Sequence, residues 1–438
     1  MKQPLTIGIA GLGTVGTGLL SLLDIHGERL ARTIGRTIEI GGISARNRTK
    51  NREVAIDRFP WFDDPVALAR APGIDVFVEL IGGDEGVPRA AVEAALSAKK
   101  HVVTANKALL ATHGNEIFKA AQEQGVMVAF EAAVAGGIPI IKALREGLTA
   151  NRIQWIAGII NGTTNFILSE MRDKGSDFNT VLQEAQRLGY AEADPTFDIE
   201  GIDAAHKATL MASIAFGIPV QFDKAYVEGI TKLQATDIRY AEQLGYRIKL
   251  LGIAKRTPLG IELRVHPTLI PAKRLIANVE GAMNAVLVQG DAVGATLYYG
   301  KGAGAEPTAS AVIADLVDIA RLADADATHR VPHLAFQPDA IADTPILPMS
   351  EITTSYYLRM HVADKLGVLA AVTRILADAT ISIDAMLQKE PADGESQTDI
   401  IMLTHQTQEK YVDAAIMKIE ALPTVIGSVT RIRLEALN

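Results

Sequence analysis

The sequence predicts an α/β protein with three parts: a doubly wound parallel sheet, an α+β unit, and a C-terminal unit of βαββαβ order. Three features of the 438 residues predict it. Short β-branched runs alternate with helical patterns as far as residue 130, longer helices mix with strands beyond residue 142, and a proline-containing stretch precedes a last set of strand and helix patterns. A chain of this length exceeds the usual size of one domain, and strands that alternate with helices favour a parallel sheet.

The first part is expected to cover residues 1–141 and to have a nucleotide-binding layout. Strand-like runs occupy residues 6–10, 38–44, 75–80, 101–104 and 126–130. Helical spacing separates them at residues 15–23, 65–69, 87–98 and 114–124. Strand, helix and strand in this order form right-handed crossovers, so the strands should lie parallel. A helix at 307–322, with Pro307 near its start, is expected to return to this part.

The second part, residues 142–306, mixes long helices with strands that predict a second sheet. Its helical patterns cover residues 178–188, 203–216 and 236–246, and its strand patterns cover residues 152–160, 249–254, 261–267 and 285–290. This mixture predicts an α+β domain. Residues 323–352 lack periodicity and hold four prolines, which predicts a linker.

The last part, residues 353–438, has the element order of a ferredoxin-like unit. Strand patterns cover residues 355–361, 382–388, 398–404 and 428–434, and helical patterns cover residues 367–379 and 410–421. Their order along the chain is βαββαβ, which is the ferredoxin-like arrangement.

Charge and cysteine content exclude several classes of function. The chain has 43 basic and 51 acidic residues, a net charge of −8, and no dense basic run, so binding to nucleic acid or to an anionic membrane lacks its electrostatic driving force. The absence of cysteine excludes disulfides, zinc–thiolate and iron–sulfur sites, and thiol nucleophiles. No apolar run is long enough to cross a membrane, and the glycine-containing segment 5–23 does not match a signal peptide. We expect a cytoplasmic protein with a small-molecule partner.

A glycine-rich turn follows the first strand and opens the first helix. Its residues are Gly11, Gly13, Thr14, Val15 and Gly16, with Leu12 between the first two. Glycines at this spacing allow a tight turn and a close backbone approach to a pyrophosphate, which the helix N-terminus attracts. The position inside a βαβ series predicts a Rossmann-type dinucleotide site rather than a purely structural turn.

The residues at the end of the second strand indicate whether the protein prefers NAD or NADP. An acidic residue there binds the 2′-hydroxyl of NAD, whereas a basic group accommodates the 2′-phosphate of NADP. Residues 44–50 hold no acid but include Arg46, Arg48 and Lys50. We expect NADP(H) to be preferred, with Arg46 as the main phosphate partner and NAD(H) also possible. The alternative is a solvated basic loop.

The main catalytic candidates lie where a carboxylate-rich segment enters an apolar helix. Asp203 and Lys207 are four residues apart and share one helix face. Such pairs are usually weak surface salt bridges, but this helix is otherwise apolar, and a buried charge requires a partner or a purpose. A dehydrogenase needs a group that takes the hydroxyl proton, and lysine serves when its pKa approaches the working pH. Lys107, just past a parallel strand, is a second candidate, and His206, on another face, is an alternative base.

Five stretches resemble the homoserine dehydrogenase family in its long form with a C-terminal ACT domain. The resemblance covers nearly the whole chain, and its most specific stretch runs from Gly189 to Lys207. The matching stretches are Thr104-Ala105-Asn106-Lys107, residues 131–139, Asn161-Gly162-Thr163-Thr164-Asn165-Phe166-Ile167-Leu168, Gly189-Tyr190-Ala191-Glu192 with Asp194-Pro195, Asp198, Gly201, Asp203 and Lys207, and Gly300-Lys301-Gly302-Ala303-Gly304 with Pro307-Thr308.

The resemblance implies reversible NAD(P)H-dependent reduction of L-aspartate 4-semialdehyde to L-homoserine, a step toward threonine and methionine. It implies that Lys207 donates or accepts the proton at the substrate oxygen and that Lys107 assists there or holds substrate and nicotinamide. Asp203 would orient the substrate, and Glu192 would bind its ammonium group. Residues 142–306 would bind substrate and dimerise. The implied backbone contacts to the cofactor add Thr104, Gly189 and Gly302.

The family also has a monovalent cation site at which backbone carbonyls bind sodium. The resemblance maps it onto Glu131, Val134, Gly136 and Ile138. The residues alone would be interpreted as a strand-end acid followed by a glycine turn. Oxygen ligands of this kind suit a weakly bound alkali ion rather than a transition metal.

ACT domains resemble the βαββαβ pattern of the last part and bind amino acids between paired copies. The turn at Asp364, Gly367, Val368 and Leu369 would offer backbone N–H groups to a ligand carboxylate. We expect feedback inhibition by L-threonine across a homodimeric or homotetrameric interface. The alternative is a dimerisation module that has lost its ligand.

Two other functions remain open from the sequence. Another amino-acid dehydrogenase would share the glycine-rich turn but would not explain residues 192–207. A catalytically silent amino-acid sensor would use the dinucleotide only as structure, and the presence of both Lys107 and Lys207 argues against it.

Overall fold

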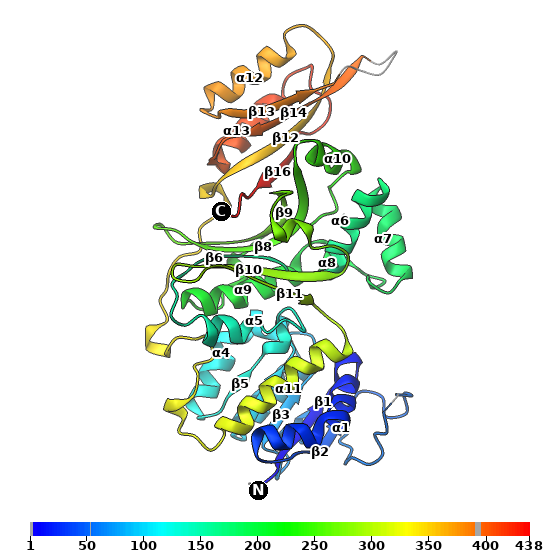
Figure 1. Ribbon diagram of the computed structural model, residues 1–438, viewed down its shortest axis with the longest axis vertical. Coiled ribbons are helices and arrows are strands. Elements are labelled where there is room, and N and C mark those ends of the chain that lie inside the picture. Colours follow the sequence, from blue (N-terminus) through cyan, green and yellow to red (C-terminus); the bar gives the residue numbers. More distant parts are fainter. Residues whose placement is uncertain (1–2, 53, 390–395) are drawn as a thin grey trace.

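The computed structural model describes residues 3–52, 54–389 and 396–438. The molecule is elongated, with the nucleotide-binding part at one end, a second sheet in the middle, and the C-terminal unit at the other end (Figure 1). Within the described residues, no helix is long and apolar enough to cross a membrane.

The first part confirms the predicted doubly wound parallel sheet. Its strands are β1 (Leu5–Ala10), β2 (Ile38–Ser44), β3 (Val76–Glu79), β4 (His101–Thr104) and β5 (Val128–Ala129), in the spatial order β2-β1-β3-β4-β5. The helices between them are α1 (Thr14–Ile34), α2 (Pro65–Arg70), α3 (Val87–Ser97) and α4 (Lys107–Glu123). The order reverses between β1 and β3, and ligands of open α/β sheets bind at the carboxyl ends of strands beside such a switch.

Two helices of this part are longer than the apolar patterns predicted. The pattern in α1 stops at Leu23, but the helix runs on with a polar, solvent-facing surface until Gly35, whose positive φ of 77° ends it. Helix α4 begins seven residues before the predicted start. The side chain of Asn106 caps it by accepting a hydrogen bond from the amide of Leu109 at 3.1 Å, so a local polar contact sets the start.

A helix from much later in the chain packs against α1. This helix is α11 (Ala305–Leu322), which lies beside α1 in Figure 1. A Cβ on Gly18 would lie 2.7 Å from the carbonyl oxygen of Ala305, so only glycine allows the two helices to come this close. Leu19 and Leu20 of α1 share one buried cluster with Val312 and Leu316 of α11.

The second sheet has eleven strands and continues from the α+β unit into the C-terminal unit. Its order is β11-β10-β6-β8-β9-β16-β12-β14-β13 along the main path. The strands of the α+β unit are β6 (Ile153–Ile159), β8 (Tyr246–Arg256), β9 (Ile261–Pro271), β10 (Met283–Gly290) and β11 (Gly294–Lys301). Those of the C-terminal unit are β12 (Thr353–Ala363), β13 (Ile383–Gln388), β14 (Gln397–Thr404) and β16 (Thr430–Leu434). The short strands β7 (Tyr226–Val227) and β15 (Thr407–Gln408) pair with β9 and β12.

The two units join where β16 runs parallel to β9. The paired residues are Arg433 with Thr268 and Leu434 with Leu269. The sequence predicted separate units, because a pairing between strands about 165 residues apart leaves no local pattern. Strand β11 was also not predicted, since it lies at the sheet edge, where few of its residues are buried.

Helices cover the second sheet and complete the C-terminal unit. Helix α9 (Ile202–Phe216) is almost wholly buried. The others are α5 (Ile140–Lys142), α6 (Gly162–Lys174), α7 (Phe178–Arg187), α8 (Thr196–Ile199), α10 (Ala235–Gln243), α12 (Val368–Asp378) and α13 (Glu409–Glu420). The predicted helix at 236–246 ends early, because Gly245 has a φ of 82° and β8 begins at Tyr246.

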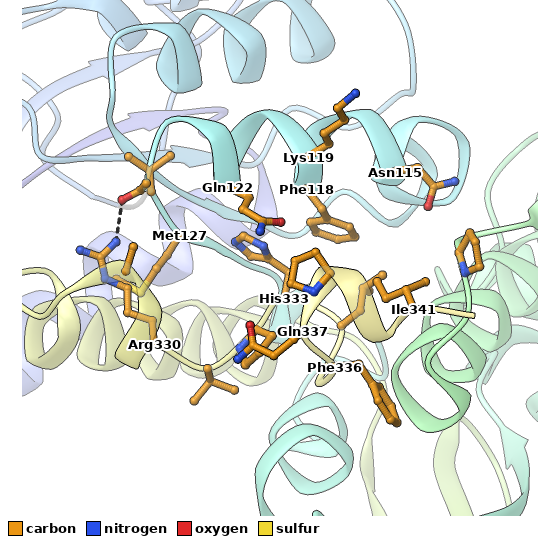
Figure 2. Close-up of a pocket in the computed structure, with 18 residues that line it drawn as sticks. Asn115, Phe118, Lys119, Gln122, Met127, Arg330, His333, Phe336, Gln337 and Ile341 are labelled. Atoms are coloured by element: carbon orange, nitrogen blue, oxygen red, sulfur yellow. Dashed lines mark hydrogen bonds between the residues drawn. The ribbon is translucent and has the colours of Figure 1, made fainter. Parts of the chain in front are cut away.

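Residues 323–352 run along the first part and then along the α+β unit, where the amides of Ala342 and Leu347 donate to the carbonyls of Gly217 and Ile261, before they enter the C-terminal unit. Arg330 donates to the carbonyl of Gly125 at 2.7 Å, and the ring nitrogen Nε2 of His333 accepts from the amide of Val128 at 3.1 Å. The His333 ring stacks on Phe118 of α4 with centroids 5.4 Å apart. An apolar cavity of about 530 Å³ lies between this stretch and α4 (Figure 2).

Candidate active site

Two lysines from different parts of the chain share one carboxylate. Nζ of Lys207 donates to Oδ2 of Asp203 at 2.7 Å, and Nζ of Lys107 lies 3.0 Å from Oδ1 of Asp203. The Lys207 ammonium also donates to the carbonyl of Ile160 at 2.8 Å. Asp203 and Lys207 are buried, whereas about a third of the Lys107 side chain is exposed. We call Lys107, Asp203 and Lys207 the lysine cluster.

Local structure explains how α9 carries two members of this cluster. Gly201, with a φ of 82°, makes the turn that precedes α9. Asp203 then lies in the first turn, where the helix dipole favours a carboxylate, and Lys207 follows one turn later. Most of the remaining residues of α9 are apolar, and nearly all are buried, so both charged groups are held in a dry environment.

The two lysines of the lysine cluster have pKa values shifted in opposite directions. Burial lowers the pKa of Lys207, although the charge of Asp203 opposes this. The charge of Asp203 raises the pKa of Lys107 above its usual value. Burial works to raise the pKa of Asp203, but the two ammonium groups hold it below its usual range. Lys207 is therefore the lysine that releases its proton more readily, and Lys107 holds its proton more tightly.

Lys107 comes from the carboxyl end of β4, where the parallel sheet favours ligands. It is the first residue of α4, after the cap residue Asn106. The amide of Asn106 donates to Oγ1 of Thr104 at 2.9 Å, and that hydroxyl donates to the buried Glu79 at 2.6 Å. Burial raises the pKa of Glu79. These hydrogen bonds join β3 to β4 beneath Lys107. Thr104, which is a predicted cofactor residue, takes part in both.

Asn161 and Asp198 support the cluster, and residue-level reasoning missed both. Nδ2 of Asn161 donates to Oδ2 of Asp203 at 2.8 Å and to Oδ1 of Asp198 at 2.7 Å. Thr163 donates to Asp198 at 3.1 Å and to the carbonyl of Tyr190 at 2.7 Å. The signal was present in two of the quoted stretches, 161–168 and 189–207, but only the fold shows that they meet.

Glu192 and Gly189 lie on an exposed loop beside the cluster. The backbone carbonyl of Glu192 accepts from Gln186 at 3.1 Å, while its side chain is exposed. The charge of Asp203 is the main cause that raises the pKa of Lys107, burial opposes it, and the charges of Asp198 and Glu192 add smaller increases. The carboxylate of Glu192 is thus within electrostatic reach of the cluster. Gly189 has a φ of 79° and open space around its Cα.

His206 points to a different environment from Lys207, as its helix position predicted. Its ring packs edge-on against Phe197 and Phe222, with centroids 5.4 and 4.3 Å away. Burial lowers the pKa of His206 to about 4. Since the ring packs against two aromatic rings and its Nδ1 has no hydrogen-bond partner among the described residues, the lysine cluster is the better proton-transfer group.

The glycine-rich turn fits a dinucleotide. A Cβ on Gly11 would lie 2.3 Å from the carbonyl oxygen of Leu80, and one on Gly16 would lie 2.1 Å from the carbonyl oxygen of Gly11. Gly13, in contrast, has nothing within 4 Å of its Cβ position and caps α1 without a side-chain hydrogen bond. The turn therefore leaves an open approach to the helix N-terminus, flanked by Thr14 and Val15, which suits a pyrophosphate.

The loop after β2 presents Arg46 to solvent. Asn47 folds the loop by accepting from the amides of Thr49 and Lys50 at 2.9 and 3.1 Å. Arg52, which sequence reasoning did not single out, donates to the carbonyl of Leu12 at 3.1 Å. This contact holds the basic loop against the glycine-rich turn.

The turn that follows β5 holds the residues that the family resemblance assigns to a cation site, and it lies against Gly302. A Cβ on Gly136 would lie 2.4 Å from the carbonyl oxygen of Gly302. The carboxylate of Glu131 accepts from the amides of Ile141 and Lys142 at 2.9 and 2.8 Å. Its side-chain oxygens are thus engaged, so any cation here would depend on backbone carbonyls. Val134, Gly136 and Ile138 belong to the same buried turn.

The predicted regulatory turn lies in the C-terminal unit, far from the lysine cluster (Figure 1). Gly367 has a φ of 87° and caps α12, which begins at Val368. The amide of Asp364 donates to the carbonyl of Ser396 at 2.8 Å. Leu366 is fully exposed. The fold therefore does not bring this turn to the active site within one chain.

A Rossmann-type sheet that ends at two lysines with a shared, buried carboxylate defines a nicotinamide-dependent oxidoreductase. Family models match homoserine dehydrogenase over residues 139–317, its NAD-binding domain over residues 11–131, and an ACT domain over residues 356–424. A homoserine dehydrogenase of Pseudomonas aeruginosa is 59% identical, with both chains covered completely.

Solved structures agree with the family models. A homoserine dehydrogenase crystal structure from Thiobacillus denitrificans is 66% identical, covers 99% of each chain, and has a TM-score of 0.95. A hyperthermophilic archaeal homoserine dehydrogenase in complex with NADPH is 26% identical, with a TM-score of 0.63, and covers 74% of this chain and 99% of its own. The chain belongs to the homoserine dehydrogenase family.

Proposed function

We propose that the protein catalyses the reversible reduction of L-aspartate 4-semialdehyde to L-homoserine, with NADPH preferred over NADH, in threonine and methionine biosynthesis. The observation that carries the proposal is the lysine cluster, in which one lysine of lowered pKa and one of raised pKa share Asp203 beside the nucleotide-binding sheet. Family membership supports the substrate.

Lys207 moves the proton in this proposal. A dinucleotide whose pyrophosphate lay at the glycine-rich turn would supply hydride to the substrate carbon, or accept it in the reverse direction. As the carbonyl is reduced, Lys207 gives its proton to the substrate oxygen, and it takes that proton back when homoserine is oxidised. Its lowered pKa makes the proton easier to release than that of an ordinary lysine. Lys107 remains an ammonium and holds the substrate oxygen by its charge.

The carboxylates bind the amino-acid end of the substrate. Glu192 meets the ammonium group from its exposed loop, and Asp203 orients the substrate against Lys207. The amide of Asn161 holds Asp203 in place by donating to its carboxylate, and the same amide donates to Asp198. The nicotinamide dinucleotide would be held by Gly11, Gly13, Thr14, Val15, Gly16, Thr104, Lys107, Gly189 and Gly302.

Arg46 sets the cofactor preference by pairing with the 2′-phosphate. Its exposure beside the glycine-rich turn, and the absence of an acidic side chain at residues 44–50, support this. Replacing Arg46 with alanine should reduce kcat/KM for NADPH by about tenfold and leave that for NADH nearly unchanged. An unchanged ratio of the two values would contradict the assignment.

A monovalent cation, sodium in our proposal, binds the backbone carbonyls of Glu131, Val134, Gly136 and Ile138 and has a structural role. The engagement of the Glu131 carboxylate by two amides supports a carbonyl-only site. Thermal unfolding in sodium chloride and in a tetramethylammonium salt of equal ionic strength tests it. A higher unfolding temperature in sodium is expected.

We further propose that L-threonine inhibits the enzyme by binding at Asp364, Gly367, Val368 and Leu369 between ACT domains of a cytoplasmic homodimer or homotetramer. The exposed turn at the N-terminus of α12 supports a site for an amino-acid carboxylate. A partner copy is needed, since the turn of one chain is remote from its own active site (Figure 1).

One set of initial rates tests the reaction and its regulation. Aspartate semialdehyde is supplied with NADPH or with NADH, each with and without L-threonine. Faster NADPH oxidation that threonine suppresses is the expected result. Activity that threonine does not inhibit would indicate that the C-terminal unit serves in assembly and not in regulation. No activity with either cofactor would overturn the proposed reaction.

A further inference from the structure

Residues 226–230 form a segment that connects the C-terminal unit to the active-site helix α9. The first two residues are strand β7, which runs parallel to β9 at Arg264 and Val265. Strand β16 of the C-terminal unit pairs with the next stretch of β9, at Thr268 and Leu269 (Figure 1). Because β8 occupies the other edge of β9, the segment and β16 lie along one edge of the same strand.

The C-terminal unit holds this segment through Glu228. Oε2 of Glu228 accepts two hydrogen bonds, from Nη1 of Arg433 and from the hydroxyl of Tyr226, each at 2.7 Å. Nη2 of Arg433 donates to the same hydroxyl at 3.0 Å. Burial works to raise the pKa of Glu228, but the charge of Arg433 holds it below its usual value. Arg433 lies on β16 and is fully buried, so it gives the Glu228 carboxylate a fixed partner.

The next residues of the segment pack against the turn that precedes α9. The amide of Ile230 donates to the carbonyl of Ile199 at 2.8 Å. A Cβ on Gly229 would lie 2.3 Å from that same carbonyl oxygen, and a Cβ on Gly201 would lie 3.5 Å from the carbonyl oxygen of Glu228. The backbones of the segment and of the turn therefore touch directly, and position 229 has no room for a side chain.

The elements on both sides of this turn belong to the proton-transfer site. Before the turn, α8 carries Asp198, which accepts a hydrogen bond from Asn161. After the turn, Asp203 lies in the first turn of α9 and accepts from Asn161 and Lys207. The amide of Gly201 links the two by donating to the carbonyl of Asp198 at 3.0 Å. A displacement of the turn would thus move both carboxylates.

We propose that Glu228 is a positioning residue, through which Arg433 of the C-terminal unit holds the turn at residues 199–201 and thereby the carboxylate of Asp203. This inference rests on the proposed function. Glu228 acts through the backbone of Gly229 and Ile230 and takes no part in proton transfer. Since a misplacement of about 1 Å can lower a rate by about a hundredfold, a small movement of the turn is enough to change kcat. The C-terminal unit then contributes to the active-site geometry of its own chain.

Steady-state oxidation of homoserine by the full-length protein tests this role. Glu228→Leu removes the acceptor and should lower kcat by about tenfold. The KM for NADP⁺ should stay unchanged, because the glycine-rich turn belongs to the other sheet. Glu228→Gln should restore most of kcat, since one amide oxygen can accept both hydrogen bonds that Oε2 accepts.

Glu435→Leu is the matched control for a merely structural effect. Glu435 is one of two carboxylates that pair with the buried Arg264, as Glu228 is one of two that pair with Arg433. Glu435 follows β16 and lies outside the segment. Its replacement should lower the midpoint of urea unfolding about as much as Glu228→Leu does, while kcat stays at the wild-type value.

Hydrogen exchange measured by mass spectrometry tests the same contact without turnover. Amides in residues 198–206 should exchange faster in Glu228→Leu than in the wild type, because the turn opens more often. They should exchange at the wild-type rate in Glu435→Leu.

Gly229→Ala carries the test if Glu228→Leu does not fold. Its Cβ would lie 2.3 Å from the carbonyl oxygen of Ile199, so the turn must move while Glu228 keeps its partners. The variant should show the faster exchange and the lower kcat. Gly147→Ala adds the same methyl group where nothing lies within 4 Å, and it should change neither.

Two results would overturn the proposal. The values of kcat and of the exchange at residues 198–206 could stay at wild-type levels in Glu228→Leu and Gly229→Ala. Alternatively, Glu435→Leu could change both as much as Glu228→Leu does, which would make Glu228 a stabilising contact only. If the wild type does not turn over homoserine, the proposed reaction fails, and the exchange rates still decide whether Glu228 positions the turn.

Discussion

The lysine cluster and the junction between β9 and β16 both bury charge, but they balance it differently. At the junction, Arg264 donates to Glu262 and Glu435 at 2.8 and 2.6 Å. Arg433 donates to Glu409 and Glu228, each at 2.7 Å. We call these six residues the arginine junction. Each arginine meets two carboxylates, whereas in the lysine cluster two ammonium groups share Asp203.

The difference separates a structural role from a chemical one. At the arginine junction, burial works to lower the pKa of Arg433, but its carboxylates raise it above the usual value, so the charge is permanent. In the lysine cluster burial prevails and lowers the pKa of Lys207. Buried charges that are fully paired hold two units together. A buried charge that shares its partner can give up a proton, and its site favours a ligand that completes the balance.

The largest expected effect tests the chemical side of this comparison. Lys207→Ala should lower kcat for homoserine oxidation by roughly 10²- to 10⁴-fold, because it removes the group that accepts the hydroxyl proton of the substrate in the proposed reaction. Steady-state kinetics at saturating substrate measures it. Lys174→Ala is the matched control, since Lys174 forms an exposed pair with Glu170 at the same i,i+4 spacing. Near-normal turnover in Lys207→Ala would make the cluster structural.

The next effect tests the structural side. Arg433→Leu should destabilise the protein by about 3–5 kcal/mol, because it leaves buried carboxylates without their cation. Urea unfolding followed by circular dichroism measures the loss. The double variant with Glu409→Leu should recover part of the stability. A fall in kcat as large as that of Lys207→Ala, with unchanged stability, would remove the distinction between the two clusters.

A pH profile sharpens the comparison within the lysine cluster. Lys207 must be neutral to accept a proton, so the rate of homoserine oxidation should rise with pH through its pKa. The charge of Asp203 stabilises the ammonium form. In Asp203→Asn the rise should therefore move to lower pH, and kcat should fall by roughly ten- to a hundredfold as the substrate loses its orientation. A profile that moves to higher pH would reverse the assigned sign.

Asp315 and Glu131 form a third group of buried charges, and the effect expected on stability there is the smallest. Oδ2 of Asp315 accepts from the amide of Glu131 at 2.9 Å, and burial together with the charge of Glu131 raises the pKa of Asp315 to about 8. A folded-state pKa above the unfolded value means that stability is full below pH 4 and is lost as pH rises toward 8.

In the wild type the free energy of unfolding should fall with rising pH by on the order of 1 kcal/mol per pH unit. Asp315→Asn should make this dependence on pH weaker. Unfolding temperatures between pH 5 and pH 8 measure the slope. Asp318→Asn, which alters an acid on the same helix that pairs with Lys142 at 2.5 Å, should keep the wild-type slope. An equal slope in all three proteins would indicate that Asp315 is charged in the folded state.

Much of the fold could be predicted because its elements are local. Alternating β-branched runs and helical spacing define the parallel sheet, and the glycine-rich turn places a nucleotide at its first helix. Element ends were less accurate where they depend on single contacts, as at Asn106 and Gly245. The eleven-stranded sheet could not be predicted, since the pairing of β16 with β9 involves distant residues.

Within the candidate site, the sequence alone determined which residue types were available: two lysines, a carboxylate on the same helix face as one of them, and no cysteine. Residue chemistry and helical spacing are properties of the chain, so a pattern can reveal them. Only the tertiary structure decided that Lys107 meets Asp203 and that Asn161 holds the same carboxylate. Those facts depend on desolvation and on distances between remote segments, which no local pattern encodes.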